Sequence, residues 1–240
     1  MANKKLLVLS FMAVVIFSLT GCSKDESPSS PAPTPVTTVT QSFQAGLSGY
    51  SGSKDTSVNN YYPGYNYGTD TTLFVGVHGT NDECERTLMK FDVSSIDSSA
   101  VVVSAQLDFT LNNNLYPITV TAYPLGKEWT EGTSVGGDYG ADCTWINANT
   151  SDPWGSSGGD FNAANEIGNA YYYGVATDGR VTMQLNASAV NGWISNPSSN
   201  HGFILKLPVE PSVSRFLVLY SEEHATAAYR PELKINYYIP

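Results

Sequence analysis

The sequence predicts an all-β fold: an antiparallel β-sandwich with long loops and one short helix. The first observation is a period-two alternation of apolar and polar residues, which is typical of strands with one buried and one solvent-facing side. It is clearest between 101 and 111, where the apolar positions are Val101, Val103, Ala105, Leu107, Phe109 and Leu111. The second observation is that such segments are short and are separated by Gly, Asn, Ser and Pro, which favours an antiparallel sandwich.

Other segments predict further strands and a single helix. The alternation recurs at 87–93, 181–185, 203–207 and 233–237, and strands are also expected at 73–78, 118–123 and 215–220. Leu88 is an exception, because it is apolar where the alternation expects a polar residue. The one helix is expected at 186–194, with Asn186 as its N-cap.

Residues 1–21 predict a bacterial lipoprotein signal peptide. Lys4 and Lys5 form a positively charged start, and 6–19 is an apolar run of 14 residues. This is shorter than the roughly 20 residues that a membrane-spanning helix needs. The run ends in Leu19-Thr20-Gly21-Cys22, which resembles the lipobox of bacterial lipoproteins. We therefore expect a lipid on Cys22; a buried cysteine after a core helix is the alternative.

Residues 22–40 predict a flexible tether, and 41–240 a single folded domain. The stretch 27–40 is rich in Pro, Ser and Thr, cannot bury a core and should form an extended spacer. Cys22-Ser23-Lys24-Asp25-Glu26 is similar to a signal that sends some Gram-negative lipoproteins to the outer face of the outer membrane. A solvated charged tether explains the same residues. We expect a lipid-anchored protein of the outer membrane, at the cell surface.

The charge of the chain excludes one class of partner. Removal of Lys4 and Lys5 with the signal peptide leaves 10 basic and 22 acidic residues, a formal charge of −12. Nucleic-acid binding depends on Lys and Arg that neutralise phosphates, so we expect no nucleic-acid partner. We expect contact with the membrane through the lipid alone, and a monomer.

Several short motifs resemble one family when they are taken in order. They are Asp55-Thr56-Ser57-Val58, Asn66-Tyr67-Gly68, Leu73-Phe74-Val75-Gly76, Glu85–Ser94, Ser104-Ala105-Gln106-Leu107, Trp129-Thr130-Glu131, Thr144-Trp145, Gly158-Gly159-Asp160-Phe161, Trp193 with Asn200-His201-Gly202-Phe203, and Arg230-Pro231-Glu232-Leu233. Together they resemble the DNRLRE domain, also described as a family of carbohydrate-binding modules found beside polysaccharide-degrading enzymes. The resemblance covers nearly all of 43–238, and Glu85–Ser94 is its most specific part.

The resemblance implies a jelly-roll sandwich that binds extracellular polysaccharide, with acidic polymers such as alginate among the ligands. One feature departs from the family pattern. The Trp-x-Glu and Thr-Trp motifs usually lie close together, whereas here Gly132 to Cys143 separates them. That insertion puts ligand contacts in this loop in doubt.

Aromatic residues in two long loops are the first candidates for sugar binding. Flat rings pack against the C–H face of a pyranose, and functional residues concentrate in long loops on a rigid sandwich. The loop 50–72 holds Tyr61, Tyr62, Tyr65 and Tyr67, although such rings also pack against a core. In the loop 132–174 we expect Trp154 to be a stacking platform, and Trp129, Trp145 and Trp193 to lie in the core.

Arg86 and Lys90 are a second candidate ligand surface. They are four residues apart on one predicted strand and therefore share its polar face. With Lys206 they would bind carboxylates of a uronic-acid polymer, arginine through two parallel hydrogen bonds. The alternative is a solvated face on which these residues form local ion pairs.

Cysteine and acidic residues give expectations about a disulfide and calcium. With Cys22 acylated, Cys84 and Cys143 remain in an oxidising compartment and are expected to pair, although the sequence does not fix their separation. The resemblance to sugar-binding sandwich modules also implies a structural Ca²⁺, which takes oxygen ligands. The candidates are Asn81-Asp82-Glu83, Asp138 with Asp142, and Asp152 with Asp160, none of which forms a diagnostic pattern.

The sequence gives little support for catalysis. His78, His201 and His224 have no metal-ligand spacing, and there is no Gly-x-Ser-x-Gly motif. We therefore expect a binding protein with no catalytic residues and no certain cofactor. Two alternatives stay open: a structural or adhesive surface protein that contacts matrix or another protein, and a small polysaccharide lyase or hydrolase.

Overall fold

The computed structural model describes residues 36–79, 83–113, 116–137, 142–211 and 213–240, of which 36–240 form one compact unit. The predicted signal peptide, Cys22 and most of the predicted tether lie outside the described residues. No helix of the described part is long and apolar enough to cross a membrane.

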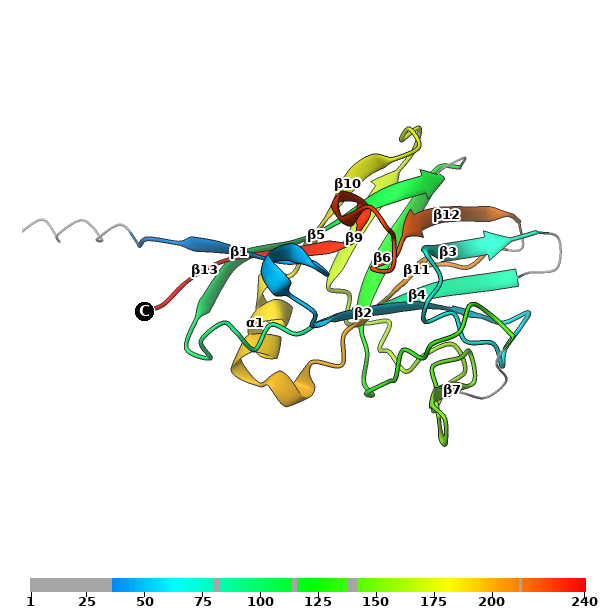
Figure 1. Ribbon diagram of the computed structural model, residues 1–240, viewed down its shortest axis with the longest axis horizontal. Coiled ribbons are helices and arrows are strands. Elements are labelled where there is room, and N and C mark those ends of the chain that lie inside the picture. The colour runs from blue at the N-terminus through cyan, green and yellow to red at the C-terminus, as the bar shows by residue number, and fades with distance from the viewer. Residues whose placement is uncertain (1–35, 80–82, 114–115, 138–141, 212) are drawn as a thin grey trace, which may run out of the picture. The chain divides into compact units, whose positions relative to one another are not determined.

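The fold is an all-β sandwich, as predicted, built on one curled antiparallel sheet (Figure 1). Its strands are β1 (Val39–Phe43), β2 (Ser53–Asn59), β3 (Thr72–His78), β4 (Glu83–Phe91), β5 (Val101–Asn113), β6 (Ile118–Pro124), β9 (Gly168–Tyr172), β10 (Gly179–Leu185), β11 (Phe203–Lys206), β12 (Arg215–Tyr220) and β13 (Glu232–Tyr238). β7 (Asn147–Asn149) and β8 (Asp152–Pro153) form a separate small hairpin.

The strands follow the order β1-β13-β5-β12-β3-β4-β11-β6-β9, with β10 added to β5 and β2 added to β4. The ladders of this sheet are antiparallel. The 13-residue strand β5 pairs with β10, β12 and β13, so it joins the parts of the curled sheet. β1 begins at Val39, and Val39 and Thr40, which were predicted to be in the tether, already pair with β13.

The predicted helix is confirmed as α1 (Ala187–Ser195), a nine-residue helix. Asn186 is its N-cap, because the Asn186 side chain accepts a hydrogen bond from the Ser188 amide at 2.9 Å. Three 3-10 turns, Leu47–Gly49, Pro197–Ser199 and Ala227–Tyr229, complete the described elements. The apolar side of α1 packs against the sheet through Val190, Trp193 and Ile194.

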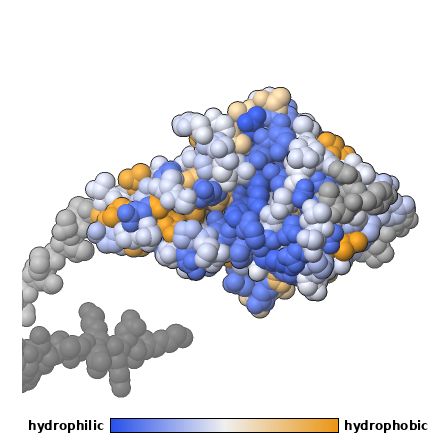
Figure 2. Space-filling view, turned by 60° about the horizontal axis from the view of Figure 1, so that its bottom comes forward, coloured by the Kyte–Doolittle hydropathy of each residue, from blue (hydrophilic) through white to orange (hydrophobic). Residues whose placement is uncertain are grey.

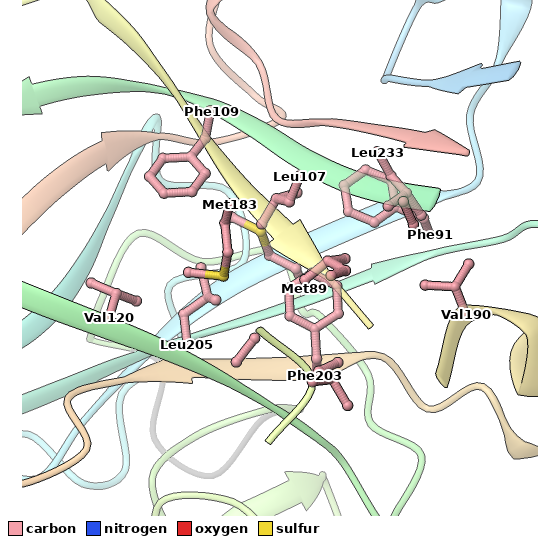
Figure 3. Packing of buried hydrophobic residues seen from close by; sticks show 14 of the residues in the cluster. Met89, Phe91, Leu107, Phe109, Val120, Met183, Val190, Phe203, Leu205 and Leu233 are labelled. Carbon is pink, nitrogen blue, oxygen red and sulfur yellow. The ribbon is translucent and has the colours of Figure 1, made fainter. Parts of the chain in front are cut away.

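The main core fills the space inside the curled sheet. Figure 3 shows Met89, Leu107, Met183 and Phe203, from four different strands, pointing toward one another. These four side chains are at most 1% exposed. The alternation predicted for β5 is confirmed from Ala105 to Leu111, where Leu107, Phe109 and Leu111 are fully buried. It is wrong at the start of the strand, where a register shift against β13 leaves Val101 and Val103 exposed and buries Val102.

A second core lies on the opposite side of β4, β6 and β11, where the sequence predicts a polar face. We call it the outer core; its members are Val58, Leu88, Tyr123, Leu125, Trp129, Cys143, Ala148, Trp154 and Ile204. Met89 and Phe203 point into the main core, while their neighbours Leu88 and Ile204 point into the outer core. The long segment between β6 and β9 therefore packs onto the sheet as a third layer.

Candidate functional site

The tyrosines of the loop between β2 and β3 lie together in an aromatic surface, which we call the tyrosine patch (Tyr61, Tyr62, Tyr65 and Tyr67). Tyr65 and Tyr67 are partly buried in it. Tyr61 and Tyr62 are 49% and 42% exposed. The Tyr62 and Tyr65 rings stack with centroids 4.9 Å apart, and the Tyr61 ring meets Tyr62 edge-on at 4.8 Å. The rings hold one another in place, so a ligand would meet a preformed surface.

Asn59, the last residue of β2, starts the turn that carries the patch. Its side-chain oxygen accepts hydrogen bonds from the Tyr61 amide at 2.7 Å and the Tyr62 amide at 3.3 Å. Its side-chain nitrogen donates to Glu83 and Glu85 of β4, both at 2.8 Å. Because Asn59 is 2% exposed, it fixes the start of the loop to the sheet.

Asn66 ties the same loop to the segment that follows β6. It is 1% exposed, and its side chain donates to the Glu131 carbonyl at 2.6 Å and the Cys143 carbonyl at 2.8 Å. The Asn66 carbonyl accepts from the Gly136 amide at 2.7 Å. At Gly132, where φ is +88°, an added Cβ would lie 2.4 Å from the Asn66 side chain, so only glycine fits this approach. The inserted segment thus supports the loop that bears the patch.

The tyrosine patch has an acidic border. Burial, followed by the charges of Glu85 and Glu83, raises the pKa of Tyr67. Burial also raises the pKa of Glu85 to about 7. Carboxylates next to the patch would repel a polyanion and accept hydrogen bonds from sugar hydroxyls.

The prediction for Trp154 is wrong, because this side chain is not an exposed stacking platform. Trp154 is 6% exposed in the outer core, and its ring nitrogen donates to the Thr144 carbonyl at 3.0 Å. Trp129 and Trp193 are buried, as predicted, while Trp145 is partly buried against the outer core.

Arg86 is not available for a uronic acid. Its guanidinium makes two hydrogen bonds to Glu210, at 2.8 and 2.9 Å, and lies over the Trp145 ring at 4.6 Å. Lys206 is 7% exposed and also pairs with Glu210, at 3.5 Å. The arginine therefore serves to attach the outer layer to β4.

Lys90 is engaged in the same way. Its ammonium group contacts both oxygens of Glu128, at 2.9 and 2.8 Å, and Lys54 and His201 contact the same carboxylate. Burial opposes ionisation of Glu128, but hydrogen bonds from Lys90, Lys54 and His201 prevail and lower its pKa to about 2. The alternative of local ion pairs thus describes both Arg86 and Lys90, with Glu210 and Glu128 as partners.

The predicted disulfide is not formed, since Cys84 and Cys143 are both free, buried thiols. Cys84 lies on β4 near Arg86 and Glu210, whereas Cys143 is a member of the outer core. Burial raises the pKa of both thiols, which makes them poor nucleophiles.

Two of the three predicted calcium candidates depend on residues that the structure does not describe, and the two acids of the third have other partners. Asp82 and Asp138 lie outside the described residues. Asp152 forms an ion pair with Lys127 at 2.5 Å, and Asp160 accepts two backbone hydrogen bonds within its own turn. Within the described part of the chain, the acidic residues that do converge are Glu131, Glu222 and Glu223.

The histidines do not form a catalytic arrangement with one another. His78 contacts Phe216 and His201 contacts Glu128. His224 has its ring centroid 4.2 Å from that of Tyr220, but the Tyr220 hydroxyl donates to Asp178 at 2.7 Å, and this bond raises the pKa of Tyr220. A tyrosine base for a lyase would need the opposite shift.

A sandwich that presents exposed rings on an ordered loop has the architecture of a binding module. Residues 47–148 match the model of carbohydrate-binding module family 96, and this range contains the whole tyrosine patch. The match supports a carbohydrate-binding module over less than half of the chain. No curated protein shows significant similarity to the sequence.

Proposed function

We propose that this protein binds an extracellular polysaccharide without cleaving it, and that the tyrosine patch is the contact surface. The observation that carries the proposal is the pair of exposed rings, Tyr61 and Tyr62, held in place by Asn59 within the segment that matches a carbohydrate-binding family. Rigid exposed tyrosines supply contact area at a small entropic cost.

The charges around the patch favour a neutral polysaccharide over a polyuronate. Glu83 and Glu85 lie at its border, and the cations that would have bound uronic acids are occupied by Glu210 and Glu128. A formal charge of −12 on the mature chain acts in the same direction. We therefore expect retardation of the protein in gels that contain neutral β-glucans or xylans, and none in gels that contain alginate. Stronger binding to alginate than to every neutral polymer would contradict this choice of ligand class.

Tyr62→Ala is expected to weaken binding to the selected glycan about five- to tenfold, because one stacking ring contributes about 1 kcal/mol and Tyr62 also positions Tyr61 and Tyr65. The melting temperature should change little, since Tyr62 is half-exposed. The measurement is isothermal titration calorimetry combined with a thermal melt.

The matched control is Tyr171→Ala, which removes a 64% exposed tyrosine from β9. We expect it to leave glycan affinity unchanged. If Tyr62→Ala retained full affinity, the tyrosine patch would not be the binding surface.

A second candidate function is adhesion to protein or matrix. Exposed apolar residues occur on β1, at the start of β5 and just beyond β13, among them Val39, Val101, Val103 and Ile239. Figure 2 shows hydrophobic residues gathered toward the end of the domain where these strands lie, whereas hydrophilic residues cover most of the middle of this face. Adhesion would gain support if no polysaccharide bound and Val103→Asp abolished attachment of the protein to matrix-coated surfaces.

We also propose that a lipid on Cys22 holds the protein at the cell surface. The support is the basic start, the short apolar run and the lipobox-like Leu19-Thr20-Gly21-Cys22. In a Gram-negative host, the wild type should enter the detergent phase and carry acyl mass on Cys22. Cys22→Ala should move the protein to the aqueous phase, and continued membrane attachment of this variant would contradict the proposal.

A further inference from the structure

Four carboxylates from three distant segments meet beside β2. Asp55 lies in β2, Glu131 follows β6, and Glu222 with Glu223 forms the turn after β12. One oxygen each of Glu131, Glu222 and Glu223 lies within 4.8 Å of the others. We call these four residues the acidic cluster.

Backbone hydrogen bonds assemble this cluster. The Asp55 amide donates to Glu131 Oε1 at 2.5 Å, and the Glu222 amide donates to Asp55 Oδ2 at 2.9 Å. The turn that carries Glu222 and Glu223 is fixed by the preceding residue, Ser221, whose amide donates to the Thr71 carbonyl at 3.1 Å. The fold itself therefore fixes the positions of these carboxylates.

Several oxygens of the cluster are buried without a hydrogen-bond donor. Asp55 is 3% exposed, yet its Oδ1 atom has no partner among the described residues, and the same holds for Glu222 Oε2 and Glu223 Oε2. Burial of an unpaired, ionised carboxylate oxygen is costly, so in their ionised form these atoms would be stabilised by a cation.

No lysine or arginine of the described residues pairs directly with these carboxylates. The charge of Arg230 on Glu222 and Glu223, and that of Lys54 on Glu131, offsets only part of the rise that burial causes in the pKa values of these acids. None of the four acids takes part in a salt bridge among the described residues. Lys54, the nearest lysine in sequence, binds Glu128 and the Trp129 carbonyl. Arg230 donates to the His224 and Ala45 carbonyls, at 2.8 and 3.0 Å.

We propose that Asp55, Glu131, Glu222 and Glu223 bind one Ca²⁺ ion. Calcium is a hard cation that takes six to eight oxygen ligands, and carboxylates bind it through one or both oxygens. The cluster contains oxygen ligands only, whereas Zn²⁺ sites are usually built from His and Cys. Mg²⁺ keeps most of its waters and rarely uses four protein carboxylates.

The ion would join three segments of the fold, β2, the turn after β12 and the start of the inserted segment. The Glu131 carbonyl is a hydrogen-bond acceptor of Asn66, which holds the tyrosine patch loop. Calcium would thus stabilise the base of that loop, but the proposal does not depend on what the loop binds.

The first test is titration of the chelator-treated protein with CaCl₂ and, separately, with MgCl₂. We expect one Ca²⁺ per molecule with a Kd of about 1 mM or lower, as in extracellular modules, and weaker binding of Mg²⁺. The melting temperature should rise by several degrees at saturating Ca²⁺. No heat of binding and no rise at about 10 mM CaCl₂ would overturn the proposal.

Variants locate the ion. Asp55→Asn is expected to lower Ca²⁺ affinity at least tenfold. Because asparagine keeps an acceptor for the Glu222 amide, it should not lower the melting temperature of the chelated protein. Glu222→Gln serves if Asp55→Asn fails to fold. Asp152→Asn, which changes an acid paired with Lys127, is the matched control and should bind Ca²⁺ as the wild type does. Loss of binding in Asp152→Asn, with full binding in both cluster variants, would place the ion elsewhere and refute the proposal.

Discussion

Trp154→Ala is expected to lower the free energy of unfolding by about 3–5 kcal/mol, which corresponds to a fall in melting temperature of roughly 10 °C for a domain of this size. Trp154 is 6% exposed, packs in the outer core and donates to the Thr144 carbonyl. The alanine variant leaves a cavity in the outer core and leaves the Thr144 carbonyl without its donor. The measurement is urea unfolding followed by fluorescence.

Tyr173→Ala is the control, because it removes a ring that is 65% exposed and should change the unfolding free energy by no more than about 0.5 kcal/mol. The same pair separates a core role from a binding role. Loss of glycan affinity in Trp154→Ala with an unchanged melting temperature would restore Trp154 as a stacking platform and contradict the burial seen in the structure.

Much of the sheet could be predicted because its signals are local. In β5 the apolar alternation from 105 to 111 predicts which residues face the main core, and in α1 an asparagine followed by a short apolar stretch indicates a capped helix. Both signals depend on residues that are neighbours in the sequence, so they can be recognised without knowledge of the tertiary fold.

The outer core could not be predicted from its own residues, since the segment around Trp154 has no periodicity and little regular structure. A signal was nevertheless present in the strands beneath it. Leu88 breaks the alternation of β4, and Ile204 lies between the inward-facing Phe203 and Leu205 of β11. Apolar residues on the face expected to be polar indicate that a further layer covers this face.

The acidic cluster was missed for a different reason. Asp55 and Glu131 each stand in a motif of the family resemblance, but nothing local shows that they meet Glu222 and Glu223 more than 90 residues further along the chain. The ion pairs of Arg86 and Lys90 are equally non-local, because Glu210 and Glu128 reach them from other segments. The sequence identifies residue types, and the topology decides their partners.

The unfolding free energy of the chelated protein is expected to fall by about 2 kcal/mol or more between pH 4.5 and pH 8. Burial, followed by the charge of Glu222, raises the pKa of Glu131 to about 8, and burial raises that of Glu223 to about 7. Burial and the three neighbouring glutamates also raise the pKa of Asp55 well above its usual range. In this pH window the folded state therefore holds protons that the unfolded state has released, and its stability is lost as pH rises.

Groups with lowered pKa values do not mask this slope, which is the fall of the unfolding free energy with pH. Glu128, with a pKa of about 2, contributes stability that is lost only as pH falls below the ordinary value of about 4.3. Glu131→Gln, whose side-chain oxygen can still accept from the Asp55 amide, should reduce the slope between pH 4.5 and 8, while the control Glu128→Gln should not. Saturating Ca²⁺ should remove the part of this pH dependence that comes from the four acids, because the ion binds the ionised carboxylates and its affinity rises as their protons leave; the part due to Glu85, whose pKa is also raised, should remain. Urea unfolding at a series of pH values, with chelator and with Ca²⁺, provides the measurement. If stability instead rose from pH 4.5 to 8 in chelator, the four acids would be ionised without a cation, and their buried oxygens would have to be stabilised by water.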